Sequence, residues 1–289
     1  MGLAYVGNQN SSTLTVINTD GDEIVKTIPV GRNPVQVDTS FDRTEVLTAN
    51  GGERSISVIS TRTNQVIEII RNVTPEPFGA VHADGKLFVP DQFTGNVTVL
   101  DAGSGTLIKR IPVVTRILSA VLHPNNQKLY VTSLVHNIWI IDVTTNQLIQ
   151  SIPKEAIWGL AFTPDGKRFI ANHYLSNFAA IYSTCTNRLI GKIPVGIAPI
   201  GVAISSNGER AYVTNSRSGS VSVIEIAAKR VIKTIPVGRV PYEVALSPDN
   251  RKIYVTNYGG TTVSVIDSKS LRVITTISVG AGPRGISII

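Results

Sequence analysis

The histidines are the first residues of this 289-residue chain whose chemistry could support catalysis. His173 is followed by Tyr174, and an imidazole beside a phenol can supply a general acid and a general base. We expect Arg116 to lie near this pair and Glu243 to add a carboxylate. One hypothesis is therefore a catalytic site made of these four side chains.

His136 and His173 could also ligate a metal, because mixed shells of histidine and carboxylate are common in metal sites. The carboxylates expected near them belong to Glu76, Asp91 and Glu155. The two histidines come from separate loops without a tight spacing, however, so we predict no metal. A haem or quinone-type cofactor would need the same histidines, since the chain has one methionine, at its first position. We therefore predict no cofactor.

Aromatic and basic residues could instead bind a ligand. Phe78, Trp158 and Tyr242 recur at one position of a repeat described below. The arginines expected around them are Arg32, Arg116, Arg217, Arg239 and Arg284. Aromatic faces and guanidinium groups together suit an anionic or sugar-like molecule, or the stacked bases of a single-stranded nucleic acid. The alternative, that these arginines are solvated loop residues, stays open.

Gln36 and Glu243 interrupt a position that glycine or serine occupies in the other repeats. A carboxylate at a crowded position is costly to bury unless a partner neutralises it. Arg284, in the neighbouring repeat at the same level, is the partner that we expect for Glu243. This pair would belong to a binding site or would simply pin the ring closed. We add Gln36, Glu155 and His136 to the expected ligand-binding residues.

The elements that must position these residues are copies of one repeat. Ile-Pro-Val-Gly occurs at 28–31, 193–196 and 235–238, and Tyr-Val-Thr-Asn occurs at 212–215 and 254–257. Relatives of the second motif begin at Tyr5, Leu47, Phe88, Tyr130 and Phe169. The starts of the seven copies are 42, 41, 42, 39, 43 and 42 residues apart. A period of about 40–45 residues indicates a β-propeller.

Each repeat is expected to hold four short strands, A to D. In the sixth repeat we predict them at 200–205, 210–214, 220–225 and 231–237. β-Branched residues are dense in these segments, Ser-Asn-Gly marks a turn between the first two, and helical periodicity is absent. The sequence therefore predicts an all-β fold, a seven-bladed β-propeller with four antiparallel strands per blade, formed by residues 1–289.

The two ends of the chain predict how the ring closes. The chain begins at an expected strand B, at 4–7, and finishes with an expected strand A, at 283–289, that no strand B follows. The C-terminal strand should therefore join the N-terminal blade. Such closure removes the free sheet edges that an open array would expose.

These motifs resemble the YVTN-type β-propeller repeat family, which includes surface-layer proteins. The resemblance rests on the two recurring motifs and on Ser-Pro-Asp-Asn at 247–250, and it extends over the whole chain. It implies a propeller with an extracytoplasmic or cell-surface location. Related propellers include lactonases, lyases and haem- or quinone-associated proteins, so the resemblance leaves the function open.

Topology predicts where a site would lie. The D-to-A and B-to-C connections share one end of the ring, which we call the mouth face, and ligands bind where side chains of several blades converge. One residue per blade is expected at the mouth, at the start of strand A: Val35, Phe78, Leu118, Trp158, Ile200, Tyr242 and Arg284. The loops of the third to fifth blades also depart from the repeat spacing, either as an added site or through loop drift.

Two functions stay open from the sequence. The first is a binding scaffold that uses the mouth face to hold an anionic or sugar-like small molecule, a polysaccharide or a protein. The second is an enzyme of the lactone hydrolase, lyase or isomerase type with its site at the mouth. The chain lacks G-x-S-x-G, H-E-x-x-H and phosphate-loop motifs, which favours the scaffold.

Composition limits the possible partners and locations. The net charge of +7 permits binding to nucleic acid or other anions, but the basic residues are spread along the chain rather than clustered. The single Cys185 excludes an intrachain disulfide, and the apolar runs are too short for a membrane helix. No signal-peptide pattern precedes the first expected strand, so a cytoplasmic location also stays open. We expect a monomer.

Overall fold

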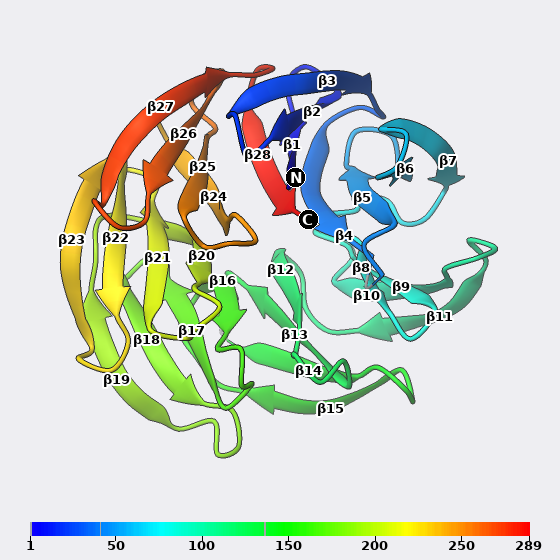
Figure 1. Ribbon diagram of the computed structural model, residues 1–289. Helices are drawn as coiled ribbons and strands as arrows, with labels where there is room; N and C mark the ends of the chain where they lie inside the picture. Colours follow the sequence, from blue (N-terminus) through cyan, green and yellow to red (C-terminus); the bar gives the residue numbers. More distant parts are fainter. Residues whose placement is uncertain (1, 41, 136) are drawn as a thin grey trace.

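The computed structural model describes residues 2–40, 42–135 and 137–289. Its strands form seven four-stranded antiparallel sheets, which are arranged as blades around a central axis (Figure 1). The prediction of a seven-bladed β-propeller with four antiparallel strands per blade is confirmed. The described residues contain no helix long and apolar enough to cross a membrane.

The strands are numbered in chain order, and each blade is given from its innermost strand outward. Blade 1 contains β28 (Pro283–Ile288), β1 (Leu3–Asn8), β2 (Thr13–Asn18) and β3 (Glu23–Pro29). Blade 2 contains β4 (Pro34–Thr39), β5 (Glu45–Asn50), β6 (Ser55–Ser60) and β7 (Gln65–Arg71). Blade 3 contains β8 (Val81–Ala83), β9 (Lys86–Pro90), β10 (Asn96–Asp101) and β11 (Leu107–Pro112).

The remaining four blades follow the same order. Blade 4 contains β12 (Ile117–Leu122), β13 (Lys128–Ser133), β14 (Ile138–Asp142) and β15 (Gln147–Ile152). Blade 5 contains β16 (Ile157–Phe162), β17 (Arg168–His173), β18 (Phe178–Ser183) and β19 (Leu189–Pro194). Blade 6 contains β20 (Pro199–Ile204), β21 (Arg210–Asn215), β22 (Ser220–Glu225) and β23 (Arg230–Pro236). Blade 7 contains β24 (Pro241–Leu246), β25 (Lys252–Asn257), β26 (Thr262–Asp267) and β27 (Arg272–Ser278).

Burial explains why the repeat motifs recur. The two middle strands of a blade are covered on both faces by neighbouring blades, so β21 and β22 are almost wholly buried and rich in β-branched residues. The outermost strand is largely exposed, but the isoleucine of each Ile-Pro-Val-Gly motif stays buried: Ile28, Ile193 and Ile235. This isoleucine anchors the end of the edge strand in the core between blades. The strands of blade 6 lie within one residue of their predicted bounds.

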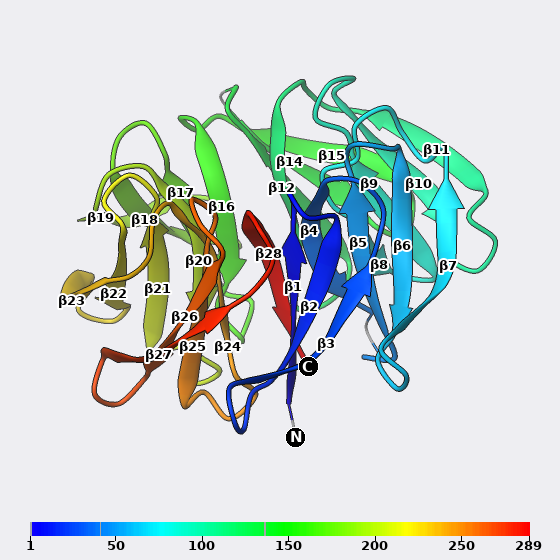
Figure 2. The same cartoon turned by 90° about the horizontal axis from the view of Figure 1, so that it is seen from above.

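The ring closes as predicted, through β28. This strand pairs antiparallel with β1, where Ile288 lies opposite Ala4, and the two termini lie at the same end of the ring (Figure 2). A polar cluster joins blade 7 to blade 1 on the outer side. Tyr254 Oη donates to Asp22 at 2.5 Å, and Lys252 Nζ donates to the same carboxylate at 2.8 Å.

The inner strand of blade 3 is the main departure from the repeat. β8 has three residues, whereas the other inner strands have six. The segment that precedes β8 is held by the buried carboxylate of Asp91. This carboxylate accepts hydrogen bonds from Thr74 Oγ1 (2.6 Å) and from the Glu76 backbone N–H (2.9 Å). An isolated bridge between Pro77 and Asp91 replaces the start of the strand. The extra residue before Phe78 is thus accommodated without opening the ring.

A β-bulge near the axis decides which side chains face the channel. In β24 the pairing with β25 is interrupted between Pro241 and Val244. Consecutive residues of a regular strand point to opposite faces, but the bulge lets both Tyr242 and Glu243 line the axis. Thr214 of the preceding blade fixes the bulge, because its Oγ1 donates to the Tyr242 carbonyl at 2.7 Å. The same bond recurs in Thr132–Trp158 and Thr256–Arg284.

Candidate functional site

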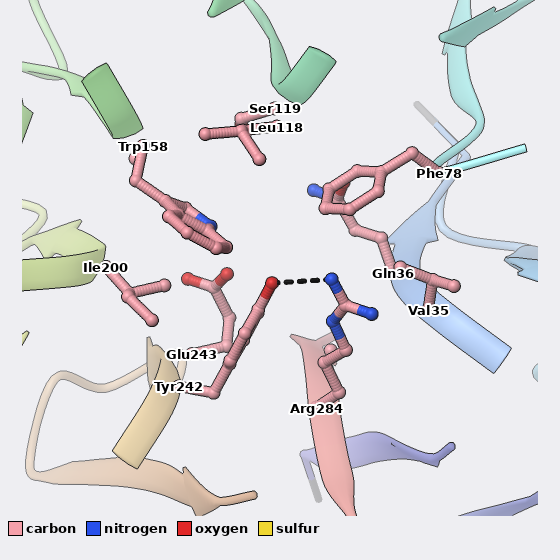
Figure 3. Close-up of a pocket in the computed structure, with 12 residues that line it drawn as sticks. Val35, Gln36, Phe78, Leu118, Ser119, Trp158, Ile200, Tyr242, Glu243 and Arg284 are labelled. Atoms are coloured by element: carbon pink, nitrogen blue, oxygen red, sulfur yellow. Dashed lines mark hydrogen bonds between the residues drawn. The ribbon is translucent and has the colours of Figure 1, made fainter. Parts of the chain in front are cut away.

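The seven residues predicted at the start of strand A all lie around the axis, where they narrow the channel (Figure 3). We call this narrow part the constriction. Its cavity is about 20 Å³, which is room for about one water molecule. The constriction itself is therefore too small for an organic ligand.

Arg284 makes the central contacts of the constriction. Its guanidinium lies over the rings of Phe78 and Tyr242, with Cζ 4.9 and 4.8 Å from their centroids. It donates to Tyr242 Oη at 2.7 Å and to Gln9 Oε1 at 3.1 Å. The expected ion pair between Arg284 and Glu243 is not formed in the described structure. Arg284 is held instead by neutral partners and aromatic rings, and it acts on Glu243 only through its charge.

Glu243 lines both the constriction and the channel beyond it, as does Gln36. Burial raises the pKa of the Glu243 carboxyl to about 7, against the lowering effects of a backbone N–H and of Arg284. Gly201 in the preceding blade leaves room for this side chain. A Cβ at Gly201 would lie 2.6 Å from the Tyr242 carbonyl oxygen and 2.8 Å from Glu243 Oε1, so the two inner strands can approach closely only with glycine there.

A larger cleft lies on the mouth face beside the constriction, over blades 5, 6 and 7. Its volume is about 630 Å³. We call it the aromatic cleft, and its lining consists of Trp158, Tyr174, Ile200, Ser216, Arg217, Ser218, Gly219, Arg239, Val240, Tyr242 and Tyr258. The Trp158 ring packs on Tyr174 with centroids 4.8 Å apart and meets Tyr242 edge-on at 6.0 Å. Arg217 and Arg239 are exposed at its border.

His173 does not reach the aromatic cleft. Its ring is 3% exposed, stacks on Phe178 with centroids 4.1 Å apart, and shares a 2.9 Å hydrogen bond between Nε2 and Tyr182 Oη. Burial lowers the pKa of His173 to about 4, although the Glu155 carboxylate opposes this shift. The imidazole is therefore neutral near pH 7 and is packed inside its blade.

The strand register shows why His173 is buried. His173 is the last residue of β17, and Asn215 is the last residue of β21, the equivalent strand of blade 6. Asn215 Nδ2 donates hydrogen bonds to two serines of β22. The alignment that started the fifth copy of the Tyr-Val-Thr-Asn motif at Phe169, and so matched Asn172 with Asn215, is therefore wrong by one residue. Asn172 takes the threonine position instead and donates to the Ile200 carbonyl of the next blade at 3.0 Å.

The proposed catalytic group of four residues is not assembled at one place. Tyr174 lines the aromatic cleft and Glu243 lines the channel, whereas Arg116 is an exposed loop residue that lines neither. Glu155 is exposed beside His173, with its Oε2 3.7 Å from Nδ1. His136 lies outside the described residues. Among residues 2–40, 42–135 and 137–289, no three metal-ligating side chains come together.

Tyr258 and Asp38 are among the residues of these cavities that were not expected from the sequence. Tyr258 lines the aromatic cleft, and it directly follows the last Tyr-Val-Thr-Asn motif, at the loop that this motif ends. Asp38 lines the channel beyond the constriction. The sequence signal for Asp38 was the alternation of polar residues in 36–39, which belong to an innermost strand. Polar side chains on one face of such a strand can find hydrogen-bond partners only in the channel.

Comparisons with known proteins give the fold and a partial family match. The family model of the cytochrome D1 heme domain matches residues 180–284, which is just over a third of the chain. The chain is 26% identical over 217 residues to the uncharacterized protein YwhL of Bacillus subtilis (strain 168). That match covers 69% of this chain and 45% of YwhL, so the chain spans less than half the length of this relative.

Solved structures share the propeller architecture. The hydrazine synthase of Kuenenia stuttgartiensis superposes with a TM-score of 0.82 at 17% identity, and the match covers 92% of each chain. The dihydro-heme d1 dehydrogenase NirN in complex with DHE superposes with a TM-score of 0.72 at 15% identity, covering 96% of this chain and 63% of that one. At these identities the similarity shows the fold alone.

Proposed function

We propose that the protein is a binding scaffold whose aromatic cleft holds a small anionic molecule with a planar or sugar-like ring. The observation that carries this proposal is the meeting of four aromatic rings with two arginines in one cleft of about 630 Å³. These residues are Trp158, Tyr174, Tyr242, Tyr258, Arg217 and Arg239. Small-molecule clefts commonly have volumes of about 300–1,000 Å³, so the size agrees with this class of ligand.

The cleft supplies a rigid stacking surface and accessible positive charge. Trp158 is held between Tyr174 and Tyr242, so little side-chain freedom would be lost when a ring stacks on it. Arg217 and Arg239 come from loops of neighbouring blades and stay exposed. A guanidinium can form two parallel hydrogen bonds with a carboxylate or phosphate, which would orient an anionic ligand against the aromatic wall.

A haem is the ligand class suggested by the names of the matching family and of NirN. Haem iron is commonly held by histidine, cysteine or methionine and in some proteins by tyrosine, and of these the described lining of the aromatic cleft contains tyrosine alone. The lining therefore does not fit a haem whose iron is held by histidine, cysteine or methionine. The two arginines and the aromatic wall support a planar anion without requiring a metal.

The alternative function, a lactone hydrolase, lyase or isomerase, has no supporting observation in the described residues. His173 is buried away from the cleft and held by Tyr182, and Arg116 does not line it. We retain two further proposals on sequence grounds. The Tyr-Val-Thr-Asn and Ile-Pro-Val-Gly motifs support membership of the YVTN-type repeat family, and with it an extracytoplasmic location.

The chain offers a matched pair of arginines to test the cleft. Arg239 and Arg32 follow the same Pro-Val-Gly sequence in blades 7 and 2, and both are exposed, but only Arg239 lines the cleft. Binding of 1-naphthoate and of galacturonate, as planar and sugar-like probes, would be followed by tryptophan fluorescence. We expect Arg239→Ala to weaken binding of at least one probe by about tenfold or more, and Arg32→Ala to leave it unchanged.

The outcomes separate the cleft from diffuse surface charge. Tyr258→Ala should weaken binding of the same probe, and neutral 1-naphthol should bind to the parent protein more weakly than 1-naphthoate does. If Arg32→Ala and Arg239→Ala weaken binding equally, the attraction is general to the basic surface and the proposal is wrong. Single-stranded DNA is the competing partner, and a binding constant that falls steeply with salt and responds equally to both variants would favour it.

A further inference from the structure

A second cavity lies on the far side of the constriction, toward the end of the ring opposite the mouth face. Its volume is about 410 Å³, and we call it the opposite-face channel. It is formed by the later residues of the inner strands and shares Gln36, Ser119 and Glu243 with the constriction. The opposite-face channel and the aromatic cleft have no lining residue in common, so the two cavities are separate sites.

The charge of this channel is opposite to that of the whole chain. Asp38 and Glu243 line it, and its described lining contains no lysine, arginine or histidine, although the chain carries a net charge of +7. No basic side chain among the described residues is paired with either carboxylate. Asp38 Oδ1 accepts a hydrogen bond only from the Thr39 backbone N–H, at 2.8 Å. At a pH above the pKa values of both carboxyls, which burial raises, the channel therefore presents negative charge that no ion pair neutralises.

Ser119 is a second, independent sign of a ligand. It is 9% exposed and lines the inner end of the channel, yet its hydroxyl has no hydrogen-bond partner in the described protein. The Gln36 side-chain amide, at the same level, also makes no hydrogen bond within the described protein. Buried polar groups almost always have a partner, which applies to Ser119, whereas Gln36 is half-buried. Both side chains line the channel, so they offer donors and acceptors to a molecule in it.

The wall of the channel is apolar. The lining includes Val121, Leu160, Phe162, Val202 and Ile286, which come from four inner strands. A bare or hydrated metal ion would gain nothing from these side chains, and no cluster of three metal-ligating groups exists in the described residues. An ion with a hydrocarbon body suits this combination, because its apolar part would leave water while its charge meets a carboxylate. The Phe162 ring could also face a cation.

We propose that the opposite-face channel binds a small organic ammonium ion. Its NH3+ group donates to Glu243, with Gln36 and Ser119 as further polar partners, and its alkyl or aryl body lies against the apolar wall toward Asp38. Burial holds the pKa values of Glu243 and Asp38 at about 7 and about 6. Tyr242 and Arg284 are the other titratable groups that face Glu243. The described lining of the channel contains no titratable side chain besides Asp38 and Glu243.

Calorimetric titration with phenethylammonium tests this site. 2-Phenylethanol is the neutral control of the same shape, and 3-phenylpropionate is the anionic one. We expect saturable binding of the ammonium ion and binding of both controls that is weaker by about tenfold or more. Glu243→Gln should weaken binding of the ammonium ion by about tenfold or more. Glu23→Gln, which changes an exposed carboxylate on β3, should leave the affinity for the ammonium ion unchanged.

A measurement on the unmodified protein guards against a misfolded variant. Because Glu243 must ionise to accept the ammonium ion, affinity should be higher at about pH 8.5 than at about pH 5. Binding of 2-phenylethanol as tight as that of phenethylammonium would overturn the proposal. An affinity for phenethylammonium that is the same at both pH values would also overturn it. So would equal effects of Glu23→Gln and Glu243→Gln on that affinity, or tight binding of Ca²⁺ in place of the ammonium ion.

Discussion

Replacing Tyr254 with phenylalanine should weaken the junction that closes the ring. The Tyr254 hydroxyl donates to Asp22 at 2.5 Å across the boundary between blades 7 and 1, and the Asp22 side chain is 13% exposed. Asp22 keeps its 2.8 Å bond from Lys252 in the variant, so no carboxylate is left without a partner. A hydrogen bond to a charged group contributes about 1.5–3 kcal/mol, and we expect the free energy of unfolding to fall by about 2 kcal/mol.

Tyr5 provides the matched control for this change. It occupies the same position of strand B in blade 1, and its hydroxyl donates to the neutral Asn64 Oδ1 at 2.6 Å. Hydrogen bonds between neutral groups contribute about 0.5–1.5 kcal/mol, so Tyr5→Phe should cost about 1 kcal/mol. The two variants remove the same atom, and they differ in the charge of the acceptor.

Urea unfolding followed by tryptophan fluorescence measures both losses. The midpoint of Tyr254→Phe should fall about twice as far as that of Tyr5→Phe, with the slope of the transition unchanged. In a double-mutant cycle, Tyr254→Phe and Asp22→Asn should show a coupling of about 1 kcal/mol. Equal losses in Tyr254→Phe and Tyr5→Phe, or a coupling of zero, would refute the reasoning from charge.

Two further predictions concern the axis and the closing strand. The folded-state pKa of Glu243, about 7, is above its ordinary value of 4.5, so its contribution to stability is complete below pH 4.5 and is lost as the pH rises through 7. Glu243→Gln should therefore match the parent near pH 4.5 and be more stable by up to about 3 kcal/mol near pH 8.5; a difference independent of pH in urea unfolding would contradict this. Deletion of residues 283–289 removes β28 and its pairing with β1, so we expect the thermal unfolding transition to lose its cooperativity; a truncated chain that melts like the parent would count against ring closure as the source of stability.

The sequence predicted the blades well because their determinants are local and repeated. The starts of the strand B copies gave the number of blades, and the unmatched strand at 283–289 gave the closure that β28 provides. The alignment also placed one residue of each inner strand at the axis, from Val35 to Arg284. Such positions can be read from the sequence because the bulge stands at the same place in most of the inner strands.

The contacts of the site could not be read in the same way. Spacing shows neither the direction of a side chain nor a shift of one residue, and such a shift gave His173 a loop position when it ends β17 as a buried residue. The partner of Arg284 was equally hidden. Glu243 stood at the matching level of the next blade, but the guanidinium bonds Gln9, which comes from the loop after β1. Packing between blades decides such choices, and no single repeat contains that information.

The hydrogen bonds from Thr132, Thr214 and Thr256 to the backbone of the next blade have a consequence for how this protein can change. Thr214 holds the backbone of Tyr242, and Thr256 holds that of Arg284, each through a carbonyl oxygen that every residue type possesses. The side chain at the axis can therefore be exchanged while its backbone keeps the same anchor. A library varied only at these axial positions should retain the fold in many members, and the ring would then serve as a frame on which new binding specificities can be selected.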